Sequence, residues 1–255
     1  GPWWYFTRTR EGWDYPVQAR APRESAEPPV LDPAHPLRGE QSILDPNIEI
    51  GEHEFFDVGS AEVSVDHEVL AFAVDTTGDE RFDVIVRRID TGAVLDDSLR
   101  GVGYGLAFSL DRRFLFYARM DESWRQHQIW RHEIGTPAER DVLVLDEADD
   151  AFSVGVGASS DDGWIVLGAQ ARDTSQVWLI PADAPLSELI PIGPRQAGLE
   201  YDVDVCADRV WIVHNRDRVN FAVAQASVAA PDQWVDAPVT SEDEYVEGLA
   251  PFNDF

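Results

Sequence analysis

The stretch from Asp57 to Arg100 reads DVGSAEVSVDHEVLAFAVDTTGDERFDVIVRRIDTGAVLDDSLR, and its pattern decides the fold. An opening run over residues 57–66 ends in an acidic turn, two apolar runs follow at Val69–Asp75 and Asp83–Asp90, and a weaker run closes the unit. The runs are short, rich in Val, Ile and Phe, and bounded by Asp and Gly, which is typical of β-strands separated by turns. This stretch therefore predicts a four-stranded antiparallel unit.

The same pattern recurs along the chain. New units start at Gly101, Ala151, Glu200 and Tyr245, so successive starts lie 44, 50, 49 and 45 residues apart. The later second and third runs are Phe114–Asp121 and Gln128–Gly135, Trp164–Asp173 and Gln176–Asp183, and Val210–Asp217 and Asn220–Ser227, with weaker fourth runs at Asp141–Asp149 and Leu186–Gly193. Four strands in each repeat of this length are typical of one blade of a β-propeller. A pair of β-sandwiches is the alternative, and the constant phase of the repeat favours the propeller.

The N-terminal residues enter the pattern partway through a blade. Trp3–Arg8 matches a second run, Tyr15–Pro22 a third and Gln41–Asn47 a fourth, while residues 22–40 contain five Pro and are predicted to form a surface loop. We therefore expect an all-β chain with approximate units at 1–56, 57–100, 101–150, 151–199 and 200–244, and an opening strand at 245–255. Because an open arc of blades leaves unpaired sheet edges, we expect a partial propeller domain from a longer protein.

Composition and charge exclude several classes of protein. The chain has 20 basic residues, all of them Arg, against 48 acidic residues, which gives a formal charge of −28. This charge argues against a nucleic-acid partner, because phosphate is repelled at every approach. No apolar run reaches the ~20 residues that span a bilayer, so we expect no membrane partner. The acidic excess has two interpretations, a field that attracts Arg- or Lys-containing peptides or a bias of overall composition, and its even spread favours composition.

The sequence offers no convincing metal site. Among the six His, only His127 and His132 are close, and residues five apart on a strand point to opposite faces. We expect His132 to be structural, hydrogen-bonded between blades. Asp75, Thr77, Asp79 and Glu80 loosely resemble a calcium loop but lack the ligand at its twelfth position, so a hairpin with Gly78 at positive φ is favoured. We predict neither a metal nor a cofactor.

A catalytic nucleophile is not expected in this chain either. A nucleophile elbow needs the pattern G-x-S-x-G, and the nearest match, Gly157-Ala158-Ser159-Ser160-Asp161, lacks the closing Gly and lies in an acidic turn. The single cysteine, Cys206, excludes a disulfide framework and is predicted to be a small buried strand residue. The strand Trp residues are expected to pack between blades.

Several segments carry a likeness to a known family. They are WWYFTRTREGWDYPV near the start, VDTTGDER at Val74–Arg81, QIWRHEIGTP at Gln128–Pro137, GLEYDVD at Gly198–Asp204 and YVEGLAPFNDF at Tyr245–Phe255. In this order they resemble the N-terminal propeller of the oligopeptidase B branch of the prolyl oligopeptidase family of serine peptidases. The resemblance covers almost the whole chain.

The resemblance implies a fold and a function for the parent protein. A seven-bladed propeller, of which this chain would hold about four to five blades, is joined in the family to a C-terminal α/β-hydrolase domain that carries Ser, Asp and His. The propeller restricts access by size, and short peptides are cleaved after Arg or Lys. The chain alone would be inactive, its partners would be the hydrolase domain and short basic peptides, and the protein would be cytoplasmic. A prolyl-specific peptidase and a non-catalytic propeller that acts as a scaffold or binding module remain alternatives.

Two charged loops are candidates for contacts with the missing domain. Their residues are Asp79, Glu80, Arg119, Asp121, Glu122 and Arg125. Paired charges on a propeller face can bridge to a second domain and hold it closed. The alternative is that they are solvated hairpin residues, since surface ion pairs contribute only ~0–1 kcal/mol.

Overall fold

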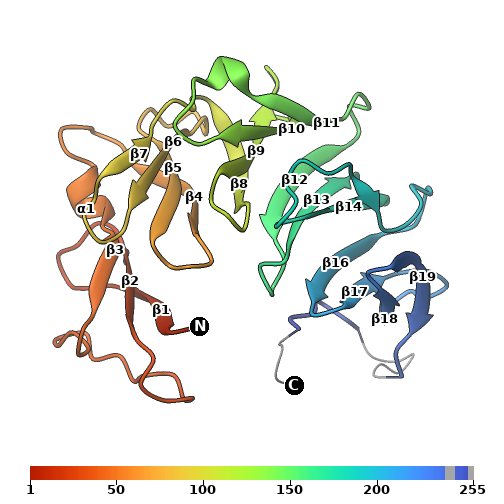
Figure 1. Ribbon diagram of the computed structural model, residues 1–255, viewed down its shortest axis with the longest axis horizontal. Coiled ribbons are helices and arrows are strands. Elements are labelled where there is room, and N and C mark those ends of the chain that lie inside the picture. The colour runs from red at the N-terminus through yellow and green to blue at the C-terminus, as the bar shows by residue number, and fades with distance from the viewer. Residues whose placement is uncertain (239–244, 252–255) are drawn as a thin grey trace.

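The computed structural model describes residues 1–238 and 245–251, and it confirms an all-β propeller architecture. Five antiparallel sheets follow one another around an arc (Figure 1), one of three strands and four of four strands. The strands of each sheet lie in chain order, and the first strand of each four-stranded sheet lies on the inside of the arc.

The elements have the following bounds. The first sheet holds β1 (Trp3–Arg8), β2 (Val17–Pro22) and β3 (Gln41–Leu44), and the second holds β4 (Asp57–Val63), β5 (Val69–Asp75), β6 (Asp83–Arg88) and β7 (Val94–Asp96). The third holds β8 (Val102–Phe108), β9 (Phe114–Met120), β10 (Gln126–Glu133) and β11 (Val142–Asp146). The fourth holds β12 (Ser153–Ala158), β13 (Trp164–Gln170), β14 (Ser175–Pro181) and β15 (Ile190–Pro191), and the fifth holds β16 (Tyr201–Cys206), β17 (Arg209–His214), β18 (Ala222–Ser227) and β19 (Ala230–Asp236). Two short helices, α1 (Pro46–Glu49) and the 3₁₀ helix Ala138–Arg140, interrupt the strands.

Two expected strands differ from the structure. The fourth run at 186–193 forms a strand only over Ile190–Pro191, where it pairs with Leu179 and Trp178. Residues 245–251 form no strand, although the Val246 amide donates to the Asn220 carbonyl, and the rest of the expected opening strand lies outside the described residues. Outermost and terminal strands have few partners, which makes their apolar pattern weak in the sequence.

A recurring side-chain hydrogen bond explains the acidic turns that end the opening runs. The hydroxyls of Ser64, Ser109 and Ser159 donate to the carboxylates of Asp66, Asp111 and Asp161, each at 2.7 Å. The third residue after each serine takes positive φ: His67 at 62°, Arg112 at 61° and Asp162 at 57°. Short polar side chains that bind nearby backbone favour such turns. Ser159, the nearest match to a nucleophile, is therefore buried in a structural hairpin turn.

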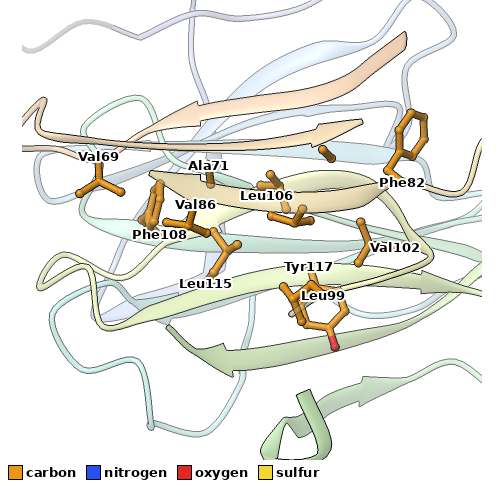
Figure 2. Packing of buried hydrophobic residues seen from close by; sticks show 12 residues of the cluster. Val69, Ala71, Phe82, Val86, Leu99, Val102, Leu106, Phe108, Leu115 and Tyr117 are labelled. Atoms are coloured by element: carbon orange, nitrogen blue, oxygen red, sulfur yellow. The ribbon is translucent and has the colours of Figure 1, made fainter. Parts of the chain in front are cut away.

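The core lies between neighbouring sheets. All seven residues of β5 are buried, and successive side chains pack on opposite faces. Val69, Ala71 and Ala73 pack toward the third sheet (Figure 2), while Leu70, Phe72 and Val74 pack toward the first. Four such clusters join the five sheets in sequence. Trp130, Trp164 and Trp178 are only partly buried at the margins of these clusters.

Buried polar groups also connect the second and third sheets. His132 on β10 has its Nε2 2.9 Å from Asp96 Oδ2 on β7 and its Nδ1 2.7 Å from Asp141 Oδ1, and the Tyr117 hydroxyl donates to Asp141 Oδ2 at 2.7 Å. Burial alone lowers the pKa of His132, but the hydrogen bonds to Asp141 and Asp96 outweigh burial and raise it. The expectation of a structural His132 bonded between blades is confirmed, and the charged imidazolium fits both carboxylates.

Candidate functional site

The six predicted contact residues lie in or next to two neighbouring hairpins. The β5–β6 loop, residues 76–82, carries Asp79 and Glu80. The β9–β10 loop, residues 121–125, carries Asp121, Glu122 and Arg125, and Arg119 lies near the end of β9. Each hairpin joins the second and third strands of its sheet. We call these two loops together the hairpin ridge.

The carboxylate of Asp75, the last residue of β5, binds the backbone of the first hairpin. Its Oδ1 accepts hydrogen bonds from the amides of Thr77 and Gly78 at 2.7 and 2.9 Å, and its Oδ2 accepts one from the Glu80 amide at 2.8 Å. Burial raises the pKa of Asp75, but these amide hydrogen bonds outweigh burial and the net shift is downward. Gly78 has φ 84°, as the hairpin interpretation predicted. The carboxylate is engaged by its own loop, and this supports a turn in place of a calcium loop.

Asp121 and Arg125 hold the second hairpin. The Asp121 carboxylate accepts from the Ser123 amide at 2.8 Å and from Arg125 Nε at 3.0 Å. Arg125 Nη1 also donates to the carbonyls of Asp149 and Phe152, both at 3.0 Å, in the segment that leads into β12. Arg125 therefore tethers this hairpin to the start of the fourth sheet, and its donors are used within the chain.

The two hairpins are linked by residues that the sequence reasoning missed. Arg81 Nη2 donates to the Asp121 carbonyl at 2.8 Å, Trp124 Nε1 donates to the Asp79 carbonyl at 2.6 Å, and the Arg81 guanidinium lies 5.4 Å from the Trp124 ring centre. Trp124 is 53 % exposed. A tryptophan in a charged loop was the available signal, but its partner lies some forty residues earlier in the chain.

The ridge is therefore acidic and aromatic toward solvent. Asp79, Glu80 and Glu122 are exposed, while Arg119 is half-buried with its guanidinium 4.6 Å from the Trp130 ring centre. The basic members of the predicted set and Asp121 are thus engaged within the chain, and Asp79, Glu80 and Glu122 are the acids exposed to solvent. Such a surface can contact a cationic surface or chain, but it offers no nucleophile and no acid–base pair.

A second group of acids lies on the inner strands and their turns. Burial, together with the charge of Asp162, raises the pKa of Glu62 on β4 to about 7. Asp162, in the β12–β13 turn, is exposed, but partial desolvation raises its pKa and the charge of Asp161 adds to the effect. This group could not be predicted from the sequence, because the proximity of Glu62 and Asp162 depends on how three sheets are arranged around the arc.

Other candidate chemistry is structural. Within residues 1–238 and 245–251, no group of three or more His, Cys, Asp or Glu is arranged to hold a metal ion. Cys206 is buried at the end of β16. Over the same described ranges, no helix is both long and apolar enough to span a membrane.

Comparison with known proteins shows matches along the whole chain. A family model described as "Prolyl oligopeptidase, N-terminal beta-propeller domain" matches residues 1–255. The chain is 33 % identical to a dipeptidyl aminopeptidase BI of Pseudoxanthomonas mexicana, over 99 % of the chain and 36 % of that protein. It is 28 % identical to Protease 2 of Moraxella lacunata, over 100 % of the chain and 36 % of that protein.

Solved structures agree with these matches. Oligopeptidase B from Leishmania major superposes with a TM-score of 0.81 and 26 % identity, covering 92 % of this chain and 33 % of that one. Oligopeptidase B from Trypanosoma brucei, in a closed form with covalently bound antipain, gives a TM-score of 0.81 and 26 % identity over 99 % of this chain and 35 % of that one. The chain thus spans about a third of the length of these relatives.

Proposed function

The chain belongs to the prolyl oligopeptidase family as its N-terminal β-propeller, and we propose that it is the access-controlling part of a serine peptidase whose catalytic residues lie in a C-terminal α/β-hydrolase domain. The observation that carries this proposal is the combination of a match over residues 1–255 with relatives about three times as long. The chemistry of peptide hydrolysis, acyl transfer through a positioned nucleophile and base, would then belong to the other two thirds of the protein.

The proposed substrates are short peptides cleaved after Arg or Lys. The likeness to Protease 2 and to two oligopeptidase B structures supports this class. A formal charge of −28 is compatible with it, because a negative surface raises the local concentration of cationic peptides. The specificity pocket itself would lie in the hydrolase domain, where a buried carboxylate would pair with the cleaved basic residue.

A second candidate activity is the release of dipeptides from a free N-terminus. A relative named dipeptidyl aminopeptidase BI, 33 % identical over nearly the whole chain, favours it. The two activities differ in whether the substrate needs a free α-amino group. Solved structures of prolyl-specific enzymes at 17–18 % identity share the fold with this chain, and they do not favour prolyl specificity.

One set of substrates separates these candidates. Full-length protein would be assayed on peptides in which a dye follows Arg or Lys and is released by cleavage. Each peptide would be made with an acylated N-terminus and as a dipeptide with a free amine, and peptides with Pro before the dye serve as the control. Cleavage of the acylated basic dyes supports endopeptidase action, and cleavage of the free-amine forms alone supports the dipeptidyl activity. Preference for the Pro analogue, or no hydrolysis of any dye, would overturn the proposal.

We further propose that the exposed acids of the hairpin ridge contact the hydrolase domain. Asp79, Glu80 and Glu122 are exposed and can meet basic groups of a second domain, although Asp79 Oδ1 also accepts from the Thr77 hydroxyl, whereas Arg119 and Arg125 are engaged within the propeller. Reversing Asp79 and Glu122 to Arg should loosen the interface and increase limited proteolysis between the domains, with exposed Glu188→Arg as the matched control. Equal proteolysis in both variants would mean that the ridge residues are only solvated.

A further inference from the structure

His214 is a buried titratable side chain at the interface between the fourth and fifth sheets. It is the last residue of β17, it is 1 % exposed, and it pairs across the fifth sheet with Tyr201 of β16. Tyr201 belongs to the apolar cluster that joins the two sheets, and directly opposite residues of paired strands share one face. The imidazole of His214 therefore lies inside this interface, where each polar atom depends on a partner from the protein.

The hydrogen bonds of the ring select its neutral form. Nδ1 accepts from the backbone amide of Arg216 at 3.1 Å, so the proton of the neutral ring is on Nε2. Nε2 lies 3.3 Å from Asp236 Oδ1 on β19, but it makes no well-aligned hydrogen bond to any described residue. A second proton would have to bind Nδ1, where it would face the Arg216 amide. Two N–H groups do not bond to each other, so the protonated ring loses this contact.

Charged groups around the ring act in both directions. Asp236 favours the protonated form, whereas Arg216 and Arg218 of the β17–β18 loop oppose it. Burial is the largest effect, and the pKa of His214 is lowered from its ordinary value. The pKa of Tyr201, on the same face of the sheet, is raised by burial, so its hydroxyl stays uncharged. The neutral ring is therefore the form that this interface stabilises.

Trp234 on β19 connects the same group to the fourth sheet. Its ring centre lies 5.5 Å from that of His214 and 4.9 Å from that of Tyr201. Its Nε1 donates to the Ile192 carbonyl at 3.0 Å, just beyond the end of β15. The guanidinium of Arg216 lies 4.2 Å from the Trp234 ring centre. Arg216 is thus held through its amide by His214 and through its guanidinium by Trp234.

The loop that follows His214 also contacts the last described segment of the chain. Residues 215–221 join β17 to β18, and the ring centre of Phe221 lies 6.0 Å from that of Tyr245. Phe221 and residues 245–249 help to line a cavity of about 510 Å³ whose other walls come from the fourth and fifth sheets. A change in this loop would therefore reach one wall of the cavity.

We propose that His214 is a pH-sensitive clasp, which holds the β17–β18 loop while its ring is neutral and releases the loop when the ring takes up a proton. On protonation the Arg216 amide loses its acceptor, and the imidazolium gains an ion pair with Asp236. Release would loosen Phe221 and with it one wall of the cavity. This inference concerns contacts within the propeller and does not depend on the proposed peptidase function.

The test follows amide hydrogen exchange in full-length protein from about pH 8 to about pH 4.5, with each rate divided by the intrinsic rate at that pH. Protection of residues 215–221 should fall about tenfold, as expected for one lost hydrogen bond, with a midpoint below ~6.5 because the pKa of His214 is lowered. His214→Asn should show no such step, because its side-chain oxygen can accept from Arg216 and does not titrate. Asp236→Asn should move the midpoint to lower pH, because it removes the charge that favours protonation.

The matched control is His53→Asn, because His53 is exposed and lies between α1 and β4. This substitution should leave the step in residues 215–221 unchanged. Constant protection of these residues across the pH range in the wild type, or a step that persists in His214→Asn, overturns the proposal. Loss of protection in all sheets at the same pH would indicate general acid unfolding and would also overturn it. An unchanged midpoint in Asp236→Asn would contradict the part assigned to Asp236.

Discussion

At the residue scale, His132 is the clearest example of one side chain that joins two blades. It is fully buried between Asp96 of the second sheet and Asp141, which precedes the last strand of the third, and no Arg among the described residues pairs with either carboxylate. Removing one partner from a buried charged network leaves the other charges uncompensated, which is more costly than losing a surface pair.

We therefore expect His132→Gln to lower the free energy of unfolding by about 3–5 kcal/mol. The matched control is His35→Gln, because His35 also contacts an aspartate, at 2.9 Å from Asp32, but is exposed. Its substitution should change stability by less than ~1 kcal/mol. Urea unfolding followed by Trp fluorescence makes the measurement, and equal effects of both substitutions would contradict the buried network.

The effect of His132 should also depend on pH. The pKa of His132 is raised, so its contribution is complete below the unfolded value of ~6.5 and is lost as the pH rises through the folded value. Although burial opposes it, hydrogen bonding lowers the pKa of Asp96, so that contribution is complete above ~3.9 and is lost as the pH falls through the folded value. The stability difference between wild type and His132→Gln should thus be greatest between about pH 4 and 6.5.

Glu62 should have the opposite effect on stability. Its pKa is raised from 4.5 to about 7, so the folded protein resists ionisation of this carboxyl and loses stability as the pH rises through that interval. Glu62→Gln should stabilise the protein by about 1–3 kcal/mol at pH 8 and have little effect at pH 4. Unfolding at both pH values would show this, and a gain of equal size at pH 4 would point to a cause other than ionisation.

At the element scale, the strands were predictable and their lateral contacts were not. The runs at Val69–Asp75, Phe114–Asp121 and Trp164–Asp173 form β5, β9 and β13, because the middle strands of a blade pack between neighbouring sheets and carry long apolar runs between turn residues. The Arg81–Trp124 link could not be read from the sequence, because it joins hairpins of two different sheets.

The hairpin ridge gives a prediction at this scale. Trp124→Ala removes the hydrogen bond to the Asp79 carbonyl and the ring under Arg81, and thereby unlinks the two hairpins. We expect a loss of stability of only about 1 kcal/mol, because Trp124 is 53 % exposed. We also expect faster amide hydrogen exchange in residues 76–82 and 121–125. Faster exchange across all sheets alike would mean that Trp124 supports the fold as a whole.

At the scale of the whole molecule, the charge of −28 has two explanations, attraction of cationic substrates or a bias of overall composition, and they differ in salt dependence. If the acidic surface attracts substrate, kcat/KM for a peptide with two arginines should fall about threefold or more between roughly 20 and 200 mM salt. The citrulline version of that peptide serves as the control and should change little. Equal salt dependence of the two peptides would favour the compositional interpretation.

The most direct measurement for the central claim compares accessibility of one cleavage site in two settings. Full-length protein would be given an octapeptide containing a single Arg, and the same eight residues inserted into an exposed loop of a folded carrier protein. If the propeller controls access, the free peptide should be cleaved at least a hundredfold faster, and trypsin should cleave both to show that each site is exposed. Comparable rates on the free and the inserted site would contradict the proposal that this chain restricts which substrates reach the catalytic domain.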